Sequence, residues 1–327
     1  MQPFEVVEAR DVAQAIELGR TAGATYLAGG TNVVDFMRAG SMEASTLIDI
    51  DWLPLRSIDF DGKGLRVGAL TRMSDVAADP MVRSHYRFVA ESLELSASAQ
   101  LRNMASIGGN LLQRTRCPYF RDRDFKCNKR VPGSGCAARE GENRRHAILG
   151  GSEACVATHA SDLAVALVAA EAEVHLQGPD GEWVCPLETF YLEPGATPQI
   201  ETRVGPGDLI LAVAVPPLPG GEHSVYLKLR ERASYEFALV SVAASVALDG
   251  RLIKQARIAL GGVATRPWRA REVEEGLQGV AIDDLAAISE VAGSAFVDAQ
   301  RLRDNAFKVE LGKRAIVAAV RQAGGHV

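Results

Sequence analysis

Four of the five cysteines in this 327-residue chain lie within 39 residues, at Cys117, Cys127, Cys136 and Cys155. Thiolates are the usual ligands of iron–sulfur clusters and of structural zinc. The spacing contains neither the close Cys pairs of zinc ribbons nor the compact run of bacterial ferredoxins. Spacing alone therefore favours an iron–sulfur site but leaves zinc and unliganded thiols open. The fifth cysteine, Cys185, ends an expected strand and is interpreted as a small buried hydrophobe.

The cysteine segment is also basic. Between residues 114 and 145 there are ten Lys or Arg and four Asp or Glu, a net charge of +6, whereas the whole chain carries −5. A basic loop would stabilise an anionic four-thiolate cluster, of iron or of zinc alike. Arginines interleaved with aromatic residues resemble a nucleic-acid-binding patch, but the intervening cysteines and the acidic remainder argue against nucleic acid as a partner.

Two glycine turns could hold a phosphate group. They are AGGTN at 28–32 and IGGN at 107–110. Glycine lets backbone N–H groups approach an anion without a Cβ in the way, and the adjacent Thr31, Asn32, Ser106 and Asn110 add polar side chains. Two such turns make phosphate binding about as plausible as a purely structural role. Neither a G-x-G-x-x-G fingerprint nor a Walker A motif is present.

Two further residues have open interpretations. Asp162 follows Ser161 at the start of an apolar helix, where a carboxylate either caps the helix or binds sugar hydroxyls, and the cap is favoured. Lys228, in YLKLRER, lies on an expected strand beside a domain boundary. It either faces a ligand cleft or is a solvated surface lysine, and the surface position is favoured.

The hydrophobic pattern predicts elements that would position these groups. The first expected helix is 11–22, with Asp11 as its N-cap. The other expected helices are 33–38, one from about 74, most of 84–104, 163–172, 271–277, 282–299 and 306–323. The expected strands are 26–28, 47–50, 65–70, 173–177, 183–185, 209–215, 226–229, 241–248 and 253–260. Residues 114–150 show no periodicity, and so long an irregular loop is usually functional or disordered. The stretch 216–223 is the best candidate for a domain boundary.

The N-terminus does not resemble a secretory signal, and no apolar run reaches the roughly 18 residues that membrane insertion requires. We expect cytoplasmic synthesis without a signal of its own. Disulfides are then a poor default for the cysteines.

Together, four segments resemble the FAD-binding medium subunit of the molybdenum hydroxylases, the superfamily of xanthine dehydrogenase, aldehyde oxidoreductase and carbon monoxide dehydrogenase. The segments are colinear: YLAGGTNVVDFMR, RNMASIGGNLLQRTRCPYFRD, SDLAVAL and LGGVATRPWRA. The cysteine pattern is most similar to the subgroup with an extra [4Fe–4S] cluster, and nearest to bacterial periplasmic aldehyde oxidoreductases.

The resemblance implies roles for individual residues. The first loop would wrap the FAD pyrophosphate, with Tyr26, Leu27, Ala28, Gly29, Gly30, Thr31, Asn32, Val33 and Val34. The second wall would be Ser106, Gly108, Gly109 and Asn110. Asp162 would hold the ribityl or flavin end, Lys228 would approach the isoalloxazine, and Cys117, Cys127, Cys136 and Cys155 would ligate the cluster. Relatives often carry Thr at the position of Ser106 and Asp at that of Asn32. The resemblance implies no catalytic residue on this chain.

The implied fold is α+β. It has a two-subdomain, PCMH-like α/β FAD-binding region, at 1–55 and 56–220 with an iron–sulfur loop at 114–156, and a C-terminal α+β domain at 221–327 with a three-stranded sheet plus helices. The implied function is electron transfer within a complex. A large partner would oxidise a substrate, an aldehyde by analogy, at a molybdenum cofactor, and a small partner would carry [2Fe–2S] clusters. FAD here would pass the electrons to an external acceptor.

Alternatives are a xanthine dehydrogenase-type complex, a stand-alone FAD oxidoreductase with a structural zinc loop, and a nucleic-acid-binding module. The final location would be cytoplasmic, or periplasmic by co-export with a partner.

Overall fold

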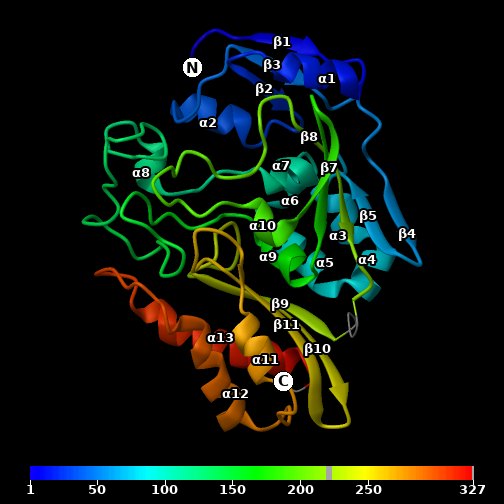
Figure 1. Cartoon of the computed structure of the whole chain (residues 1–327), viewed down its shortest axis with the longest axis vertical. Helices are drawn as coiled ribbons and strands as arrows, with labels where there is room; N and C mark the ends of the chain where they lie inside the picture. Colours follow the sequence, from blue (N-terminus) through cyan, green and yellow to red (C-terminus); the bar gives the residue numbers. More distant parts are fainter. Residues whose placement is uncertain (219–222, 326–327) are drawn as a thin grey trace.

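The computed structural model describes residues 1–218 and 223–325, which form three β-sheets with helices packed against them. The sheets lie one below another along the long axis of the molecule (Figure 1). The expected boundary between 220 and 221, within the stretch 216–223, falls on residues 219–222, which lie outside the described residues.

The first sheet is parallel, with the strand order β1-β3-β2. Its strands and helices are β1 (Glu5–Glu8), α1 (Val12–Gly19), β2 (Ala24–Leu27), α2 (Val33–Ala39) and β3 (Thr46–Asp49). The predicted N-cap of α1 is confirmed, because an Asp11 carboxylate oxygen accepts a hydrogen bond from Gln14 N at 2.8 Å. The first glycine turn joins β2 to α2, so the order of elements places it at the end of a strand of this sheet.

The second sheet is antiparallel, with the order β4-β5-β8-β6-β7. Its strands are β4 (Ile58–Asp61), β5 (Gly64–Gly68), β6 (Glu173–Gly178), β7 (Gly181–Pro186) and β8 (Leu209–Val215). The helices around it are α3 (Met73–Ala78), α4 (Pro80–His85), α5 (Arg87–Glu94), α6 (Ala99–Arg102), α7 (Ile107–Leu111), α9 (Asp162–Ala169) and α10 (Leu187–Phe190). Every residue of α9 is buried, and the helix packs against α5 and α7 as well as the third sheet.

The third sheet has three long antiparallel strands and one two-residue strand at its edge, in the order β12-β11-β10-β9. The strands are β9 (Ser224–Leu229), β10 (Val240–Asp249), β11 (Leu252–Gly261) and β12 (Trp268–Arg269). The helices are α11 (Arg271–Gly276), α12 (Leu285–Ala292), the 3-10 helix η1 (Gly293–Phe296) and α13 (Phe307–Ala323). The long helix α13 packs on β9 and β10, and their buried side chains form one continuous core.

Residues 114–156 form a folded segment at the side of the molecule (Figure 1). They contain one short helix, α8 (Pro118–Arg121), and are otherwise irregular, as predicted. The chain doubles back on itself so that Cys127 and Cys136 pair in an antiparallel bridge. The segment is therefore fixed by its own contacts rather than by regular secondary structure.

Three predictions of local structure were wrong. The IGGN turn is the first part of α7, because the Ser106 hydroxyl caps it by accepting from Gly109 N at 3.2 Å. The expected helix over 84–104 is interrupted between α5 and α6, where Ala97 adopts a left-handed conformation at φ 49°. The helix expected over 282–299 ends at Ala292 and continues only as η1.

Within the described ranges, none of the helices has the length and apolar character needed to cross a membrane.

Candidate functional site

The two glycine loops line one hollow of about 330 Å³, which we call the first hollow. Residues from β2, α2, α7 and the loop before β8 form its walls. The lining residues that were predicted from the sequence are Tyr26, Ala28, Gly29, Gly30, Thr31, Asn32, Val33, Ser106, Gly108 and Gly109. Three other predicted residues, Leu27, Val34 and Asn110, do not line it. The structure thus brings the two loops together from positions about 80 residues apart in the chain.

The first loop offers free backbone donors. Among the residues that the structure describes, the N–H groups of residues 29–32 have no hydrogen-bond acceptor in the protein. A Cβ on Gly29 would lie 1.8 Å from the Met104 carbonyl oxygen, and Gly30 has a φ of +71°. Only glycine satisfies both positions without strain. A short row of unpaired N–H groups at the start of a helix is suited to an anion such as a diphosphate.

Tyr26 stabilises the wall of the first hollow, and its hydroxyl is not available to a ligand. The carbonyls of Ala15, at 3.2 Å, and Gly207, at 3.1 Å, share the single proton of its OH in a bifurcated hydrogen bond. Burial, with a smaller contribution from Asp208, raises the pKa of Tyr26 to about 12, so the phenol stays protonated and keeps both bonds.

Arg116, which was not among the predicted site residues, lies beside the first loop. Its guanidinium donates to the side-chain oxygen of Asn32 and to Asp35, the latter at 2.9 Å. The hydrogen bond from Arg121 is the main cause that lowers the pKa of Asp35, with further contributions from Arg116. The cysteine segment therefore supplies a cation next to the glycine loop. No sequence signal marked this pairing, since Asn32 and Arg116 are 84 residues apart.

A second hollow of about 370 Å³ adjoins the first, because Leu112, Arg114 and Val204 line both. We call it the second hollow. It is lined by aromatic, polar and charged side chains, including His159, Tyr191, Lys129 and Glu201, and by Cys155 of the cysteine set. The pair of hollows could accept an elongated ligand, with a diphosphate in the first and a planar ring system in the second.

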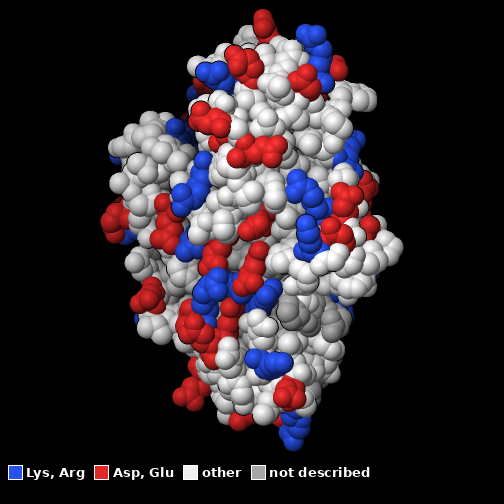
Figure 2. All heavy atoms as spheres, turned by 45° about the vertical axis from the view of Figure 1, so that its right-hand side comes forward, with Lys and Arg blue, Asp and Glu red and all other residues white. Residues whose placement is uncertain are grey.

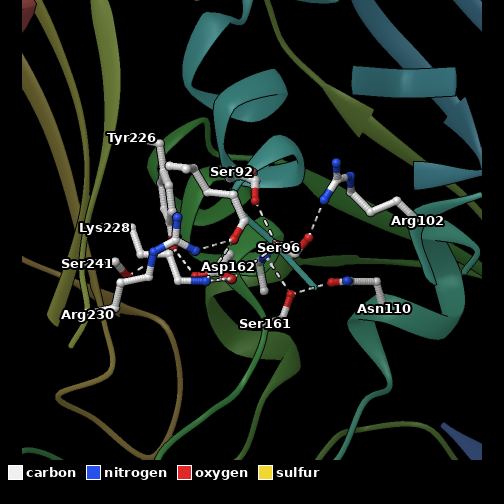
Figure 3. Close-up of polar contacts among 12 residues, drawn as sticks. Ser92, Ser96, Arg102, Asn110, Ser161, Asp162, Tyr226, Lys228, Arg230 and Ser241 are labelled. Atoms are coloured by element: carbon white, nitrogen blue, oxygen red, sulfur yellow. Dashed lines mark hydrogen bonds and ion pairs between the residues drawn. The ribbon is translucent and has the colours of Figure 1, made fainter. Parts of the chain in front are cut away.

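Asp162 lies at the centre of a buried polar network (Figure 3). Its Oδ2 accepts from Lys228 Nζ at 2.8 Å and from Ser96 Oγ at 3.0 Å, and its Oδ1 accepts from Tyr226 OH at 2.8 Å. Lys228 Nζ also donates to the Leu95 carbonyl at 3.0 Å. Burial, and next the Asp162 charge, raise the pKa of Tyr226 well above its ordinary value. The network joins α9 to β9 and therefore fixes the last sheet against the middle of the molecule.

Both favoured interpretations of this pair were wrong. Ser161, not Asp162, caps α9, because its hydroxyl accepts from Ala164 N at 2.9 Å and in turn donates to Asn110 Oδ1 at 2.5 Å. Lys228 is not a solvated lysine, since its side chain is 1% exposed. It lies behind Asp162 and lines neither hollow. No local sequence signal indicates this contact, because Asp162 and Lys228 are 66 residues apart.

The four clustered cysteines lie close to one another, and none forms a disulfide. Burial is the main cause that raises the pKa of the Cys117 thiol to about 12, and the neighbouring Cys127 and Cys155 raise it further. Burial likewise raises the pKa of Cys155, with Cys136 and Cys127 adding to it. Sγ of Cys117 is 3.2 Å from His146 Nε2, and Ala157 N donates to Cys155 Sγ at 3.5 Å. Such buried thiols ionise readily only with a cation to balance them.

In the part of the chain that the structure describes, no three His, Cys, Asp or Glu side chains are grouped closely enough to hold a single metal ion.

The basic residues of the cysteine segment are largely neutralised by acids elsewhere in the chain. Six acidic residues outside 114–145 form ion pairs with it, namely Asp35, Glu43, Glu153, Glu201, Glu231 and Glu236. The +6 charge that was expected to stabilise an anionic cluster is therefore partly compensated by these ion pairs. On the face shown in Figure 2, Lys and Arg alternate with Asp and Glu and do not gather in one basic field. Nothing in this distribution favours a nucleic-acid partner.

Comparison with known proteins identifies the family. The family model described as "FAD binding domain in molybdopterin dehydrogenase" matches residues 2–218, and that described as "CO dehydrogenase flavoprotein C-terminal domain" matches residues 225–323. The chain belongs to the FAD-binding subunits of the molybdenum hydroxylases. The α+β fold predicted from the sequence is confirmed.

Individual relatives of this molybdenum hydroxylase subunit extend over nearly its whole length. The aldehyde oxidoreductase FAD-binding subunit PaoB of Escherichia coli is 47% identical over 94% of this chain and 94% of that protein. The glyceraldehyde dehydrogenase medium chain of Sulfolobus acidocaldarius is 26% identical over 86% of this chain and 83% of its own length. The solved carbon monoxide dehydrogenase of Hydrogenophaga pseudoflava shares the fold, with a TM-score of 0.78 and 24% identity over 99% of this chain and 98% of that one.

Proposed function

We propose that this chain is the FAD- and [4Fe–4S]-carrying electron-transfer subunit of a heteromeric molybdenum hydroxylase that oxidises an aldehyde. The observation that carries the proposal is the pair of adjoining hollows, with unpaired backbone N–H groups in the first and Tyr191 and Cys155 in the second. A flavin held there would lie beside the cysteine set. The 47% identity to an aldehyde oxidoreductase subunit supports the aldehyde as substrate class, and carbonyl oxidation itself would take place on a partner.

The residues of the first hollow are suited to the FAD diphosphate. The N–H groups of residues 29–32 would donate to its oxygens, and Arg116 would fix the first loop by donating to the Asn32 side-chain oxygen. The capped N-terminus of α7, at Ser106, approaches the same space from the opposite wall. Leu27 would support the loop from behind, and Asn110 would do so through Ser161, whereas the side chain of Val34 is exposed.

Asp162 would act near the flavin end, as the resemblance implies, but Lys228 would act through Asp162 and not on the isoalloxazine itself. Asp162 lines a small hollow together with Cys117, His146 and Phe237, whereas Lys228 lines neither this hollow nor the first and second hollows and holds the Asp162 carboxylate. We assign Lys228 the role of fixing the charge and position of Asp162. Direct contact of Lys228 with the isoalloxazine has no support from this geometry.

The cluster proposal rests on the chemistry of the four thiols. Cys117, Cys127, Cys136 and Cys155 are near one another, none of them forms a disulfide, and Ala157 N donates a hydrogen bond to Cys155 Sγ. Hydrogen bonds of this kind stabilise thiolates that bind iron. In a cubane each thiolate binds a different iron atom, so the four sulfurs need not share one ion. When bound, FAD and the cluster would supply electron transfer in single steps and release of electron pairs by the flavin.

Within this proposal the chain works with a molybdenum-cofactor large subunit, a [2Fe–2S] small subunit and an external electron acceptor. The segments 1–55, 56–220 and 221–327 would be its two FAD-binding subdomains and its C-terminal domain. A xanthine dehydrogenase-type complex and a stand-alone oxidoreductase with a zinc loop are the alternatives. The complex would remain in the cytoplasm or be exported with a partner that carries a signal.

Cofactor analysis of the purified full chain tests the proposal. We expect one FAD per chain together with four iron atoms and four acid-labile sulfides. Zinc without sulfide would favour the zinc-loop alternative, and protein without flavin absorbance would contradict the proposal altogether.

A further inference from the structure

His159 lies between the cysteine segment and α9, and its environment fixes the position of its ring proton. Its Nδ1 accepts a hydrogen bond from Ser161 N at 3.2 Å. An imidazole nitrogen that accepts carries no proton, so the proton of the neutral ring is on Nε2. Burial is the main cause that lowers the pKa of His159 to about 4, and the ring is therefore neutral at physiological pH. His159 thus presents one N–H donor in a defined direction.

That donor has no acceptor in the described parts of the chain, 1–218 and 223–325. Among the described residues, His159 Nε2 is one of the few side-chain polar atoms that are both inaccessible to solvent and without a hydrogen-bond partner. Leaving a buried donor unpaired costs about 1–3 kcal/mol. Turning the ring would break the bond to Ser161 N. Tyr191 also packs edge-on against the ring, with centroids 4.4 Å apart.

The side chain lines the second hollow, and a ligand there would become the missing acceptor once a small shift of the lining uncovers Nε2. The carboxylate that lines the same hollow, Glu201, is already engaged by Arg114 Nε at 2.5 Å and by Lys129 Nζ at 3.1 Å. The Tyr191 hydroxyl is likewise engaged, since it donates to the Leu111 carbonyl at 3.0 Å. The polar groups of Glu201 and Tyr191 therefore already have partners within the protein, whereas Nε2 of the adjacent His159 does not.

We propose that His159 is a flavin-binding residue whose Nε2–H donates to an acceptor on the pyrimidine edge of the isoalloxazine, and that it stabilises the reduced flavin. The inference rests on the proposed position of the flavin in the second hollow. Reduction places negative charge on the N1–C2 carbonyl edge of the ring. A hydrogen-bond donor at that edge becomes stronger as the charge develops, so it favours the reduced form over the oxidised form.

Two substitutions at this position separate the donor from the rest of the side chain. In His159→Asn, the amide oxygen can replace Nδ1 as acceptor for Ser161 N, while the donor at the Nε2 position is lost. In His159→Gln, the longer amide can return a donor to that position. We expect His159→Asn to lower the ratio of reduced to oxidised FAD at a fixed potential about tenfold, and His159→Gln to recover most of this loss. Tenfold corresponds to about 30 mV for a two-electron couple.

The measurement is a spectroscopic redox titration of the flavin in the full chain, within the complex in which it is produced. If a variant retains too little FAD for titration, the dissociation constants of oxidised and reduced FAD give the same ratio. His175→Asn is the matched control, because His175 Nε2 is also buried and unpartnered among the described residues but the side chain, on β6, lines neither hollow.

A His159→Asn potential equal to that of the wild type would overturn the inference. An equal shift in His175→Asn would also overturn it, because the effect would then not depend on the hollow. Both outcomes leave the proposed function intact as long as the wild-type chain contains FAD. A wild-type chain without FAD would overturn the proposed function and the inference with it.

Discussion

The Asp162–Lys228 pair gives a quantitative prediction for the substitution Lys228→Met. The two side chains are 7% and 1% exposed, and their charged atoms are 2.8 Å apart. Methionine keeps much of the length and volume of lysine but removes the ammonium group. The Asp162 carboxylate would then stay buried with only the neutral donors Ser96 Oγ and Tyr226 OH, at 3.0 and 2.8 Å.

Breaking a buried ion pair by removing one partner costs about 3–5 kcal/mol, because the other charge is left uncompensated. Two remaining hydrogen bonds to Asp162 place this case at the lower end, about 3 kcal/mol. With a change in melting temperature of about 2 °C per kcal/mol for a chain of this size, we expect Tm to fall by about 6 °C. The double variant Asp162→Asn with Lys228→Met removes both charges, so it should recover more than half of this loss.

Thermal unfolding followed by circular dichroism measures these shifts. The control is Lys254→Met, which alters an exposed lysine on β11 and should leave Tm unchanged. A decrease in Tm of less than about 2 °C for Lys228→Met would refute the assignment of a buried, charged pair. A double variant less stable than Lys228→Met alone would refute it as well.

Three further predictions concern the cofactor sites and a buried lysine. Cys127→Ser should lose iron while keeping FAD, and Cys185→Ser, which alters the cysteine outside the set, should keep both; full iron in the first variant would reject the ligand assignment. Gly29→Ala should abolish FAD binding, because its Cβ would lie 1.8 Å from a backbone oxygen, whereas Gly62→Ala meets nothing within 4 Å and should bind FAD normally. Burial lowers the pKa of Lys308 from 10.5 to about 7. Between pH 7 and pH 10.5 the unfolded chain therefore binds one more proton at this lysine than the folded chain does. The free energy of unfolding should rise with pH across this range. Lys308→Met should remove this rise in denaturant titrations from pH 7 to pH 10.5, and an unchanged slope would count against the burial effect.

Local sequence signals were enough to predict most of the elements. Asp11 caps α1 as expected, and the apolar run of α9 is buried on every side. The strands β1 and β4 were missed because most of their residues are exposed, which removes the alternating pattern on which strand prediction depends. The break between α5 and α6 was missed because Ala97 adopts an unusual positive φ that its residue type does not signal.

The parts of the candidate site that consist of short sequence motifs could be predicted. The contacts between residues far apart in the sequence could not. The glycine loops could be recognised because their flexibility is encoded locally in Gly29 and Gly30. The partners of Asp162 could not, since a sequence does not show which strand will bring Lys228 beside α9. The same holds for Arg116 and Asn32. The unpaired donor of His159 depends on the residues that surround it in the fold, which the sequence does not show.

The central claim is that electrons from substrate oxidation on a partner reach a flavin bound to this chain. Anaerobic addition of an aldehyde to the purified complex, followed by rapid-scan absorbance spectroscopy, tests it most directly. We predict bleaching of the flavin band together with reduction of the iron–sulfur centres, and loss of the flavin component in a complex that contains Gly29→Ala. A flavin that stays oxidised while the other centres are fully reduced would contradict the account.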